Sequence, residues 1–121
     1  MDEDKLNRLP PDVKKQFLKY ALKLSEKKTK SKVHDDFLAF VKHVWPEFIE
    51  GPHHKKIAEK FNRLAKGEVK RLIINMPPRH TKSEFASFLL PSWMVGRKPD
   101  LKIIQTTHTT ELAIRFGRKA K

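Results

Sequence analysis

The sequence predicts an α/β fold in which several helices precede the start of a parallel β-sheet. In the first half of the 121-residue chain, apolar residues recur at three- and four-residue intervals, which is the period of an amphipathic helix. In the second half, short apolar runs at residues 72–76 and 102–106 lie on either side of a helical segment. Strand, helix and strand in that order are typical of a β-α-β unit with parallel strands and a right-handed crossover.

The chain is strongly basic. It has 27 Lys and Arg against 14 Asp and Glu, a formal charge of +13 and a pI of about 10.1. Such a charge favours polyanionic partners such as nucleic acid and nucleotides. The absence of cysteine excludes a disulfide scaffold, a thiolate zinc site and a cysteine nucleophile. No apolar run approaches the roughly 20 residues of a membrane span, so no membrane partner is expected.

Residues 1–32 form a polar leader that turns basic after Asp12, with eight Lys and one acid between positions 13 and 32. Its apolar residues share one stripe of a helix: Val13, Phe17, Tyr20, Ala21 and Leu24. Residues 25–32 contain no apolar residue and are interpreted as a linker. Two interpretations of the leader stay open. It is either a solvated helix with a tether, or an arm that contacts DNA or docks a partner protein.

Two further helices are expected before the first strand. One covers about residues 35–45 and is stopped by Pro46. The other covers about residues 53–66, and Gly67 stands where a left-handed C-terminal cap belongs. Trp45 and Trp93 are both expected to lie in the core.

The remaining elements alternate between strand and helix. In chain order they are a buried strand at 72–76, a loop at 77–81, a helix from Lys82 to about Leu90 that Pro91 bends or ends, a strand at 102–106, a Thr-rich loop at 106–110 and a last helix through Phe116. The loop at 106–110 either contacts DNA or caps the last helix. Because doubly wound sheets usually have about five or more strands, residues 33–121 are expected to be the N-terminal part of a larger α/β domain.

The junction between the first strand and its helix carries the candidate chemistry. A phosphate-binding loop needs converging backbone N–H groups, a helix N-terminus, a Lys for the β/γ-phosphates and a neighbouring hydroxyl for Mg²⁺. Lys82 and Ser83 supply the last two at the expected place. The glycines of the standard pattern are missing, since their positions hold Met76 and Thr81. From the residues alone, a phosphate site and a Pro-rich turn with a surface lysine both remain open.

Residues 73–84, Ile-Ile-Asn-Met-Pro-Pro-Arg-His-Thr-Lys-Ser-Glu, resemble the deviant Walker A loop of the large terminase subunit of tailed bacteriophages. That family has an Arg-containing loop without the first glycine. Residues 37–41, 45–46, 51–54, 67–72, 105–109 and 112–118 also resemble the family's flanking segments, in the same order. The resemblance covers about residues 33–121, and Thr81 stands where many relatives have Gly.

This resemblance implies an ATPase with Mg²⁺ as cofactor and defined roles for the loop. Lys82 would hold the β/γ-phosphates as a catalytic residue, Arg79 would contact the γ-phosphate, and Ser83 would ligate Mg²⁺. Pro78, His80 and Thr81 complete the implied ATP-binding loop. His54 is implied, by its segment, as a neighbour of the adenine ring.

The family also implies partners and a wider activity. Large terminases cleave double-stranded viral DNA with a C-terminal nuclease and translocate it into the procapsid, as a ring of subunits working with the portal protein and the small terminase subunit in the host cytoplasm. Residues 33–121 contain no strand ending in Asp-Glu (Walker B) and no nuclease carboxylates. The 121 residues alone are therefore expected to be inactive as an ATPase or endonuclease.

Two other functions remain as alternatives. One is another P-loop ATPase or kinase, such as a helicase, and the other is a small basic DNA-binding module without nucleotide chemistry. Adjacent His53 and His54 point in different directions on a helix and have no third ligand, so they predict no metal site.

Overall fold

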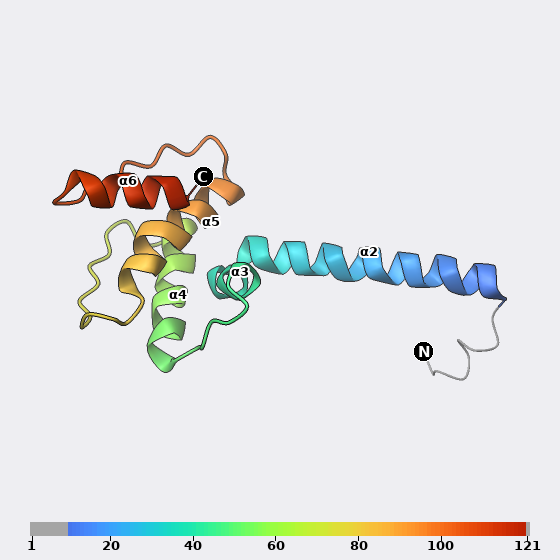
Figure 1. Cartoon of the computed structure of the whole chain (residues 1–121). Helices are drawn as coiled ribbons and strands as arrows, with labels where there is room; N and C mark the ends of the chain where they lie inside the picture. The colour runs from blue at the N-terminus through green and yellow to red at the C-terminus, as the bar shows by residue number, and fades with distance from the viewer. Residues whose placement is uncertain (1–9, 121) are drawn as a thin grey trace. The chain divides into compact units, whose positions relative to one another are not determined.

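The computed structural model describes residues 10–120, and within them every regular element is helical (Figure 1). The elements are α2 (Pro11–Asp35), α3 (Phe37–Val44), α4 (Pro52–Ala65), the π-helix η1 (Glu84–Leu89), α5 (Leu90–Arg97) and α6 (Thr110–Lys119). The chain divides into two compact units, Met1–Lys32 and Val33–Lys121. None of the described helices is both long enough and apolar enough to cross a membrane.

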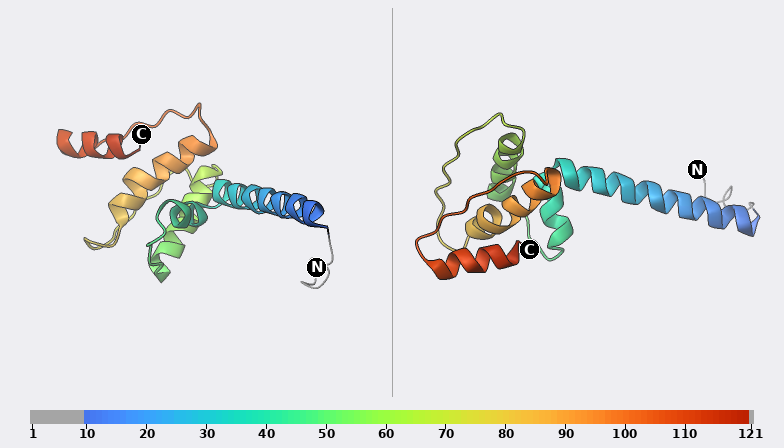
Figure 2. Two further views of the ribbon diagram at one scale, coloured as in Figure 1. Left: turned by 45° about the vertical axis from the view of Figure 1, so that its right-hand side comes forward. Right: turned by 90° about the horizontal axis from the view of Figure 1, so that it is seen from above.

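The predicted parallel sheet is wrong: residues 10–120 contain no strand. The segments 72–76 and 102–106 are irregular loops, no backbone hydrogen bond joins them within residues 10–120, and two further views likewise show helices and loops without an arrow (Figure 2). Ile73 is 86% exposed and Ile104 is 91% exposed. A strand in a parallel sheet is covered on both faces and paired along its edge, and neither condition holds here. The apolar runs have the composition of strands without the partners that would make them strands.

Helix α2 is longer than expected, because the presumed linker at residues 25–32 is helical. Lys is a good helix former, and the hydroxyls of this stretch bond back to the helix itself. Ser25 donates to the carbonyl of Leu22 at 2.8 Å, and Thr29 donates to the carbonyl of Ser25 at 2.9 Å. No residue of α2 is buried, so its apolar stripe is open to solvent.

Helices α3 and α4 form where the sequence places them, and their ends have explicit caps. Asp36 accepts a bond from the amide of Ala39 at 2.9 Å and so caps α3. At the end of α4, Gly67 has a φ of 80° and donates to Leu64, while Glu68 donates to Arg63, both at 3.0 Å. This is the Schellman arrangement, which the glycine makes possible.

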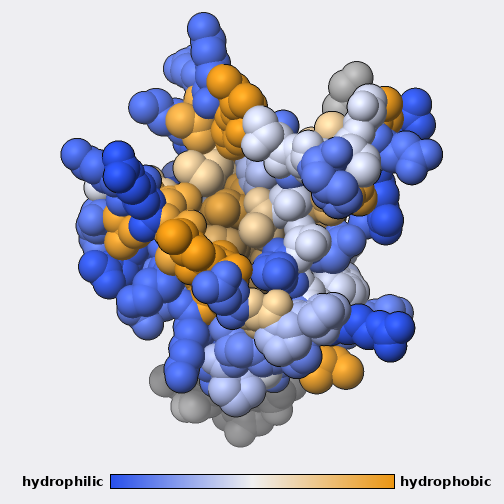
Figure 3. Space-filling view, turned by 90° about the vertical axis from the view of Figure 1, so that its left-hand side faces the viewer, coloured by the Kyte–Doolittle hydropathy of each residue, from blue (hydrophilic) through white to orange (hydrophobic). Residues whose placement is uncertain are grey.

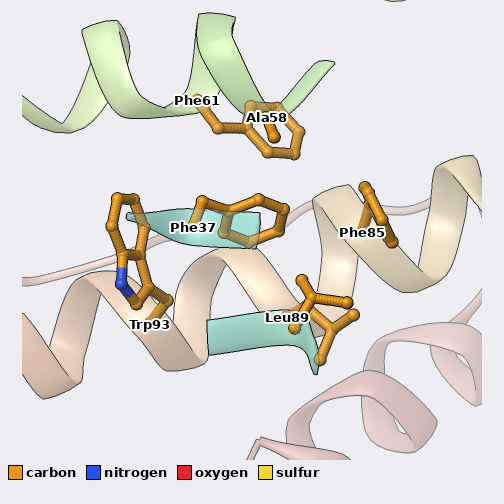
Figure 4. Packing of buried hydrophobic residues seen from close by; sticks show 7 residues of the cluster. Phe37, Ala58, Phe61, Phe85, Leu89 and Trp93 are labelled. Carbon is orange, nitrogen blue, oxygen red and sulfur yellow. The ribbon is translucent and has the colours of Figure 1, made fainter. Parts of the chain in front are cut away.

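The core lies in the second unit, and its fully buried members come from helices α3, α4, η1 and α5 (Figure 4). Phe37 is fully buried, and the edges or faces of three rings meet it at centroid distances of 5.0–5.5 Å. These rings belong to Phe61 of α4, Phe85 of η1 and Trp93 of α5. The indole of Trp93 also donates to the carbonyl of Val33 at 2.9 Å. Trp45, which was expected in the core, is 37% exposed.

Of the two outcomes expected at Pro91, a bend or an end, the end does not occur, because the helix that begins at Lys82 continues through α5 to Arg97. Proline lacks the N–H that would bond to the carbonyl four residues earlier, here that of Ser87. The side-chain amide of Gln105 donates to this carbonyl instead, at 3.0 Å. The preceding turns form η1, in which the amide of Leu90 bonds to Phe85, five residues back.

Helix α6 begins at a capping threonine and is held against η1. Thr109 accepts from the amide of Leu112 at 3.4 Å, which matches the capping interpretation of the Thr-rich loop. Near the other end, Lys119 bonds to both carboxylate oxygens of Glu84 at 3.0 Å and lies 5.6 Å from the ring centre of Phe88. This pairing places the end of α6 beside the start of η1.

Candidate phosphate-binding site

The loop at residues 77–81 leads directly into a helix that starts at Lys82. The first helical bond runs from the amide of Phe85 to the carbonyl of Thr81 at 2.9 Å. The amides of residues 82–84 precede it and have no helical acceptor, so they point out of the helix N-terminus toward the loop. Together with the helix dipole, they provide a positive end suited to an anion.

The backbone of the loop alternates between right- and left-handed conformations. Among the described residues other than glycine, only Arg79 (φ 66°) and Thr81 (φ 56°) have positive φ. The sign of φ therefore changes at every step from Pro78 to Lys82. Alternation of this kind is typical of nests, in which successive N–H groups face one concave side and bind an anion, so the loop has the φ signs of such a nest.

A cavity of about 550 Å³ opens at this loop and is lined by residues 76–84. Lys82 reaches across it, and its Nζ donates to the carbonyl of Met76 at 3.3 Å. The lysine is thus held over the loop by a single weak bond to a neutral acceptor. A phosphate in the cavity would offer it a charged acceptor, which makes a stronger hydrogen bond.

His54 of α4 is hydrogen-bonded to the loop through Thr81. The Nδ1 atom of His54 accepts from the amide of Gly51 at 2.8 Å, so Nε2 carries the proton and donates to the hydroxyl of Thr81 at 2.7 Å. Thr81 in turn donates to the carbonyl of His80, also at 2.7 Å. This chain of bonds fixes a neutral His54 and holds Thr81 in its left-handed conformation.

The surroundings of His54 favour the neutral ring. Burial lowers the pKa of His54 below its ordinary value of 6.5, the charges of His53 and His80 lower it further, and Glu50 opposes the shift. Phe48 and Phe85 pack against the ring at centroid distances of 4.7 and 5.1 Å. The ring is 6% exposed. It is placed to position the loop, and its faces are covered by protein.

The six predicted loop residues, from Pro78 to Ser83, line the same cavity. Arg79 and Ser83 are exposed, and the Nδ1 of His80 donates to the carbonyl of Pro78 at 2.9 Å. No cluster of three or more His, Asp or Glu side chains within residues 10–120 is arranged to hold a metal ion. Ser83 therefore offers a hydroxyl ligand without a carboxylate cluster around it.

Two features of the site were not predicted from the sequence. Glu84 lines the cavity, but its charge is paired with Lys119 and not with Lys82. Gly51 caps α4 without a side chain, and a Cβ there would lie 2.8 Å from the ring of His53. The motif Gly-Pro-His-His carried a usable signal, because a His at the third helical position can accept from the capping amide, as Glu or Gln does in a capping box.

Comparison with known proteins adds no relative: no family model, no curated protein and no solved structure matches this chain.

Proposed function

We propose that this protein binds the triphosphate of ATP, with Mg²⁺, in the cavity at residues 76–84, as part of a DNA-packaging ATPase like the large terminase subunits it resembles. The observation that supports this most strongly is the alternating backbone from Pro78 to Lys82 at the N-terminus of a helix. Amides that converge on a cavity, a helix dipole and a lysine held at its mouth are the parts that phosphate recognition requires.

Each residue has a role in this proposal. The amides of the loop and of the first helical turn bind phosphate oxygens, and Lys82 exchanges its bond to Met76 for one to the β/γ-phosphates. Ser83, whose side chain is exposed beside them, supplies a hydroxyl to Mg²⁺. Arg79, also exposed, extends the positive charge toward the γ-phosphate. His54 does not contact the phosphates in this proposal and acts indirectly, by holding Thr81 in place through their hydrogen bond.

Hydrolysis needs a carboxylate that activates water, and the acid in this cavity is Glu84. Both carboxylate oxygens of Glu84 accept hydrogen bonds from Lys119. The proposal for the 121 residues is therefore that they bind ATP without hydrolysing it. In the packaging assembly, the proposed partners are double-stranded DNA, the portal protein, the small terminase subunit and further copies of the subunit.

The test is a titration of the 121-residue protein with a fluorescent ATP analogue and Mg²⁺. Lys82→Ala should weaken binding by about 10- to 100-fold, since a hydrogen bond to a charged group contributes about 1.5–3 kcal/mol. Lys66→Ala is the matched control, because Lys66 is an exposed lysine at the end of α4 and outside the cavity. Equal affinities of the parent and the Lys82 variant would show that the cavity is not the nucleotide site.

A basic DNA-binding module without nucleotide chemistry is the second candidate, and helix α2 favours it. The helix carries eight lysines between residues 13 and 32, and none of its residues is buried. In this case the protein would bind DNA and show no saturable binding of the ATP analogue. The same titration therefore separates the two functions.

A further inference from the structure

The segment at residues 72–76 alternates between buried and exposed side chains although no strand within residues 10–120 pairs with it. Leu72, Ile74 and Met76 are partly buried, and the first two pack on the core. Ile73 and Asn75 point away from it and are exposed, Ile73 by 86%. A period of two is that of an extended chain lying with one face on the protein. Figure 3 views the side of the molecule that carries this segment in Figure 1, and hydrophobic side chains lie open there among hydrophilic ones.

The main chain of this segment has free hydrogen-bonding capacity. Among the described residues, no backbone group of residues 72–76 bonds to another backbone group. The bond found there joins the Met76 carbonyl to the side chain of Lys82. An extended segment with a row of unpaired N–H and C=O groups is a template for an added strand.

A groove of about 380 Å³ runs between this segment and helix α4. Its floor is apolar, with Ile57 facing the segment, and its α4 side is rimmed by Lys56, Lys60 and His53. Lys70 and Arg71 directly precede the segment in the chain and are exposed, so basic residues also lie at its N-terminal end. Among the residues that the structure describes, those that line the groove include no acid.

We propose that residues 72–76 bind an extended peptide of a partner protein, apolar in the middle and acidic at its ends, by addition of a strand. The main chain of the peptide bonds to the free groups of the segment, and alternate side chains enter the groove beside Ile57. Its acidic ends lie near Lys56, Lys60 and Arg71. Five residues of strand span about 17 Å at roughly 3.3 Å per residue, which sets the length of the apolar part.

Charge decides between this occupant and a second copy of the chain. Pairing two copies through this segment would bring the same lysines and arginine together, and like charges facing each other oppose association. An acidic peptide gains from the same groups. The proposal rests on the segment and its groove and does not depend on nucleotide binding.

The probe is a capped peptide of three valines alternating with two threonines, flanked at each end by two glutamates. Amide hydrogen exchange of the whole protein is followed with and without it. We expect exchange in residues 72–76 to slow by at least about tenfold in the presence of saturating peptide, because strand pairing protects amides. A peptide with lysines in place of the glutamates should bind at least about tenfold more weakly.

Two variants at an exposed position test the main-chain bonds. Ile73→Pro removes one backbone donor and should weaken peptide binding, whereas Ile73→Thr keeps the donor and the preference for extended structure and should bind like the parent. The proposal is overturned if the peptide binds without protecting residues 72–76. It is also overturned if these amides are protected by self-association at higher protein concentration and not by the peptide.

Discussion

His54 donates a hydrogen bond of 2.7 Å to Thr81, 27 residues further along the chain, and this bond joins helix α4 to the candidate phosphate loop. Thr81 is β-branched and has a φ of 56°, a conformation that such residues rarely adopt. The left-handed region costs an L-residue about 1–2 kcal/mol. The bond from His54 and the one to the carbonyl of His80 offset this cost.

The first prediction is that His54 and Thr81 are energetically coupled. Thr81→Gly alone should change the free energy of unfolding little, because relief of the left-handed backbone offsets the loss of a hydrogen bond worth about 0.5–1.5 kcal/mol. In a His54→Phe background that bond is already absent, so Thr81→Gly should stabilise the protein by about 1 kcal/mol. Urea unfolding of the parent, both single variants and the double variant measures the coupling. Simple additivity of the two changes would contradict it.

The second prediction concerns pH. In the folded protein the pKa of His54 lies below its ordinary value of 6.5, and in the unfolded chain it returns to that value. Below pH 6.5 the unfolded chain binds a proton at His54 more readily than the folded chain does. The contribution of neutral His54 to the free energy of unfolding is therefore complete above pH 6.5, and it is lost as the pH falls from 6.5 toward the lower pKa of the folded protein. Urea unfolding at several pH values between 5 and 8 should show this loss.

The control for the pH effect is His54→Phe, which should lose less stability over the same interval. Binding of the ATP analogue should weaken over the same fall in pH, because protonation of His54 at Nδ1 removes the acceptor for the Gly51 amide. If the free energy of unfolding depends on pH in the same way in parent and variant, the loss of stability arises from groups other than His54.

The third prediction concerns the link between helices α3 and α4. Asn62 accepts from the amide of Phe37 at 2.8 Å and donates to Asp36 at 2.7 Å. Asn62→Ala leaves a partly buried amide and carboxylate without these bonds and should cost about 1–3 kcal/mol. Asn62→Asp keeps an acceptor but places two carboxylates together, so the stability it loses relative to the parent should be larger at pH 7 than at pH 4.5. Thermal melts of parent and variant at both pH values test this, and an equal loss at the two pH values would refute the account.

The sequence predicted the helices better than the segments between them. Helix α4 and its cap at Gly67 follow from local signals, namely the helical period and a glycine at the end. The failed strand at residues 72–76 has the right alternation, but strand formation depends on a partner that local pattern does not reveal. The continuation of the helix past Pro91 also depends on a distant residue, since Gln105 bonds to the carbonyl that proline leaves without a backbone donor.

The candidate site was half predictable. The position of Lys82 and Ser83 at the start of a helix follows from neighbouring residues, and in the structure the helix does begin at Lys82. The link from His54 to Thr81 does not, because it joins residues that only the packing of α4 brings together. The pairing of Glu84 with Lys119 is likewise a long-range consequence of where α6 lies.

The last prediction concerns DNA. Every phosphate that a lysine neutralises releases counterions, so log K for duplex DNA falls with log salt at a slope of about −0.9 per contact. Lys15, Lys19, Lys23 and Lys27 recur every fourth residue of α2 and so follow one another along the exposed helix. Replacing all four by Gln should make the slope shallower by up to about 3.6, since four contacts are lost.

The matched control removes the apolar stripe and keeps the charge. Phe17→Ala with Leu24→Ala alters two exposed apolar residues of α2 and should leave the slope unchanged if α2 binds DNA through its lysines. Binding of DNA should also be insensitive to base sequence, because residues 13–32 include no Arg or Asn to read base edges. If the Gln variant keeps the parental slope while the stripe variant loses a protein partner, α2 is a docking helix and its lysines serve only to keep it in water.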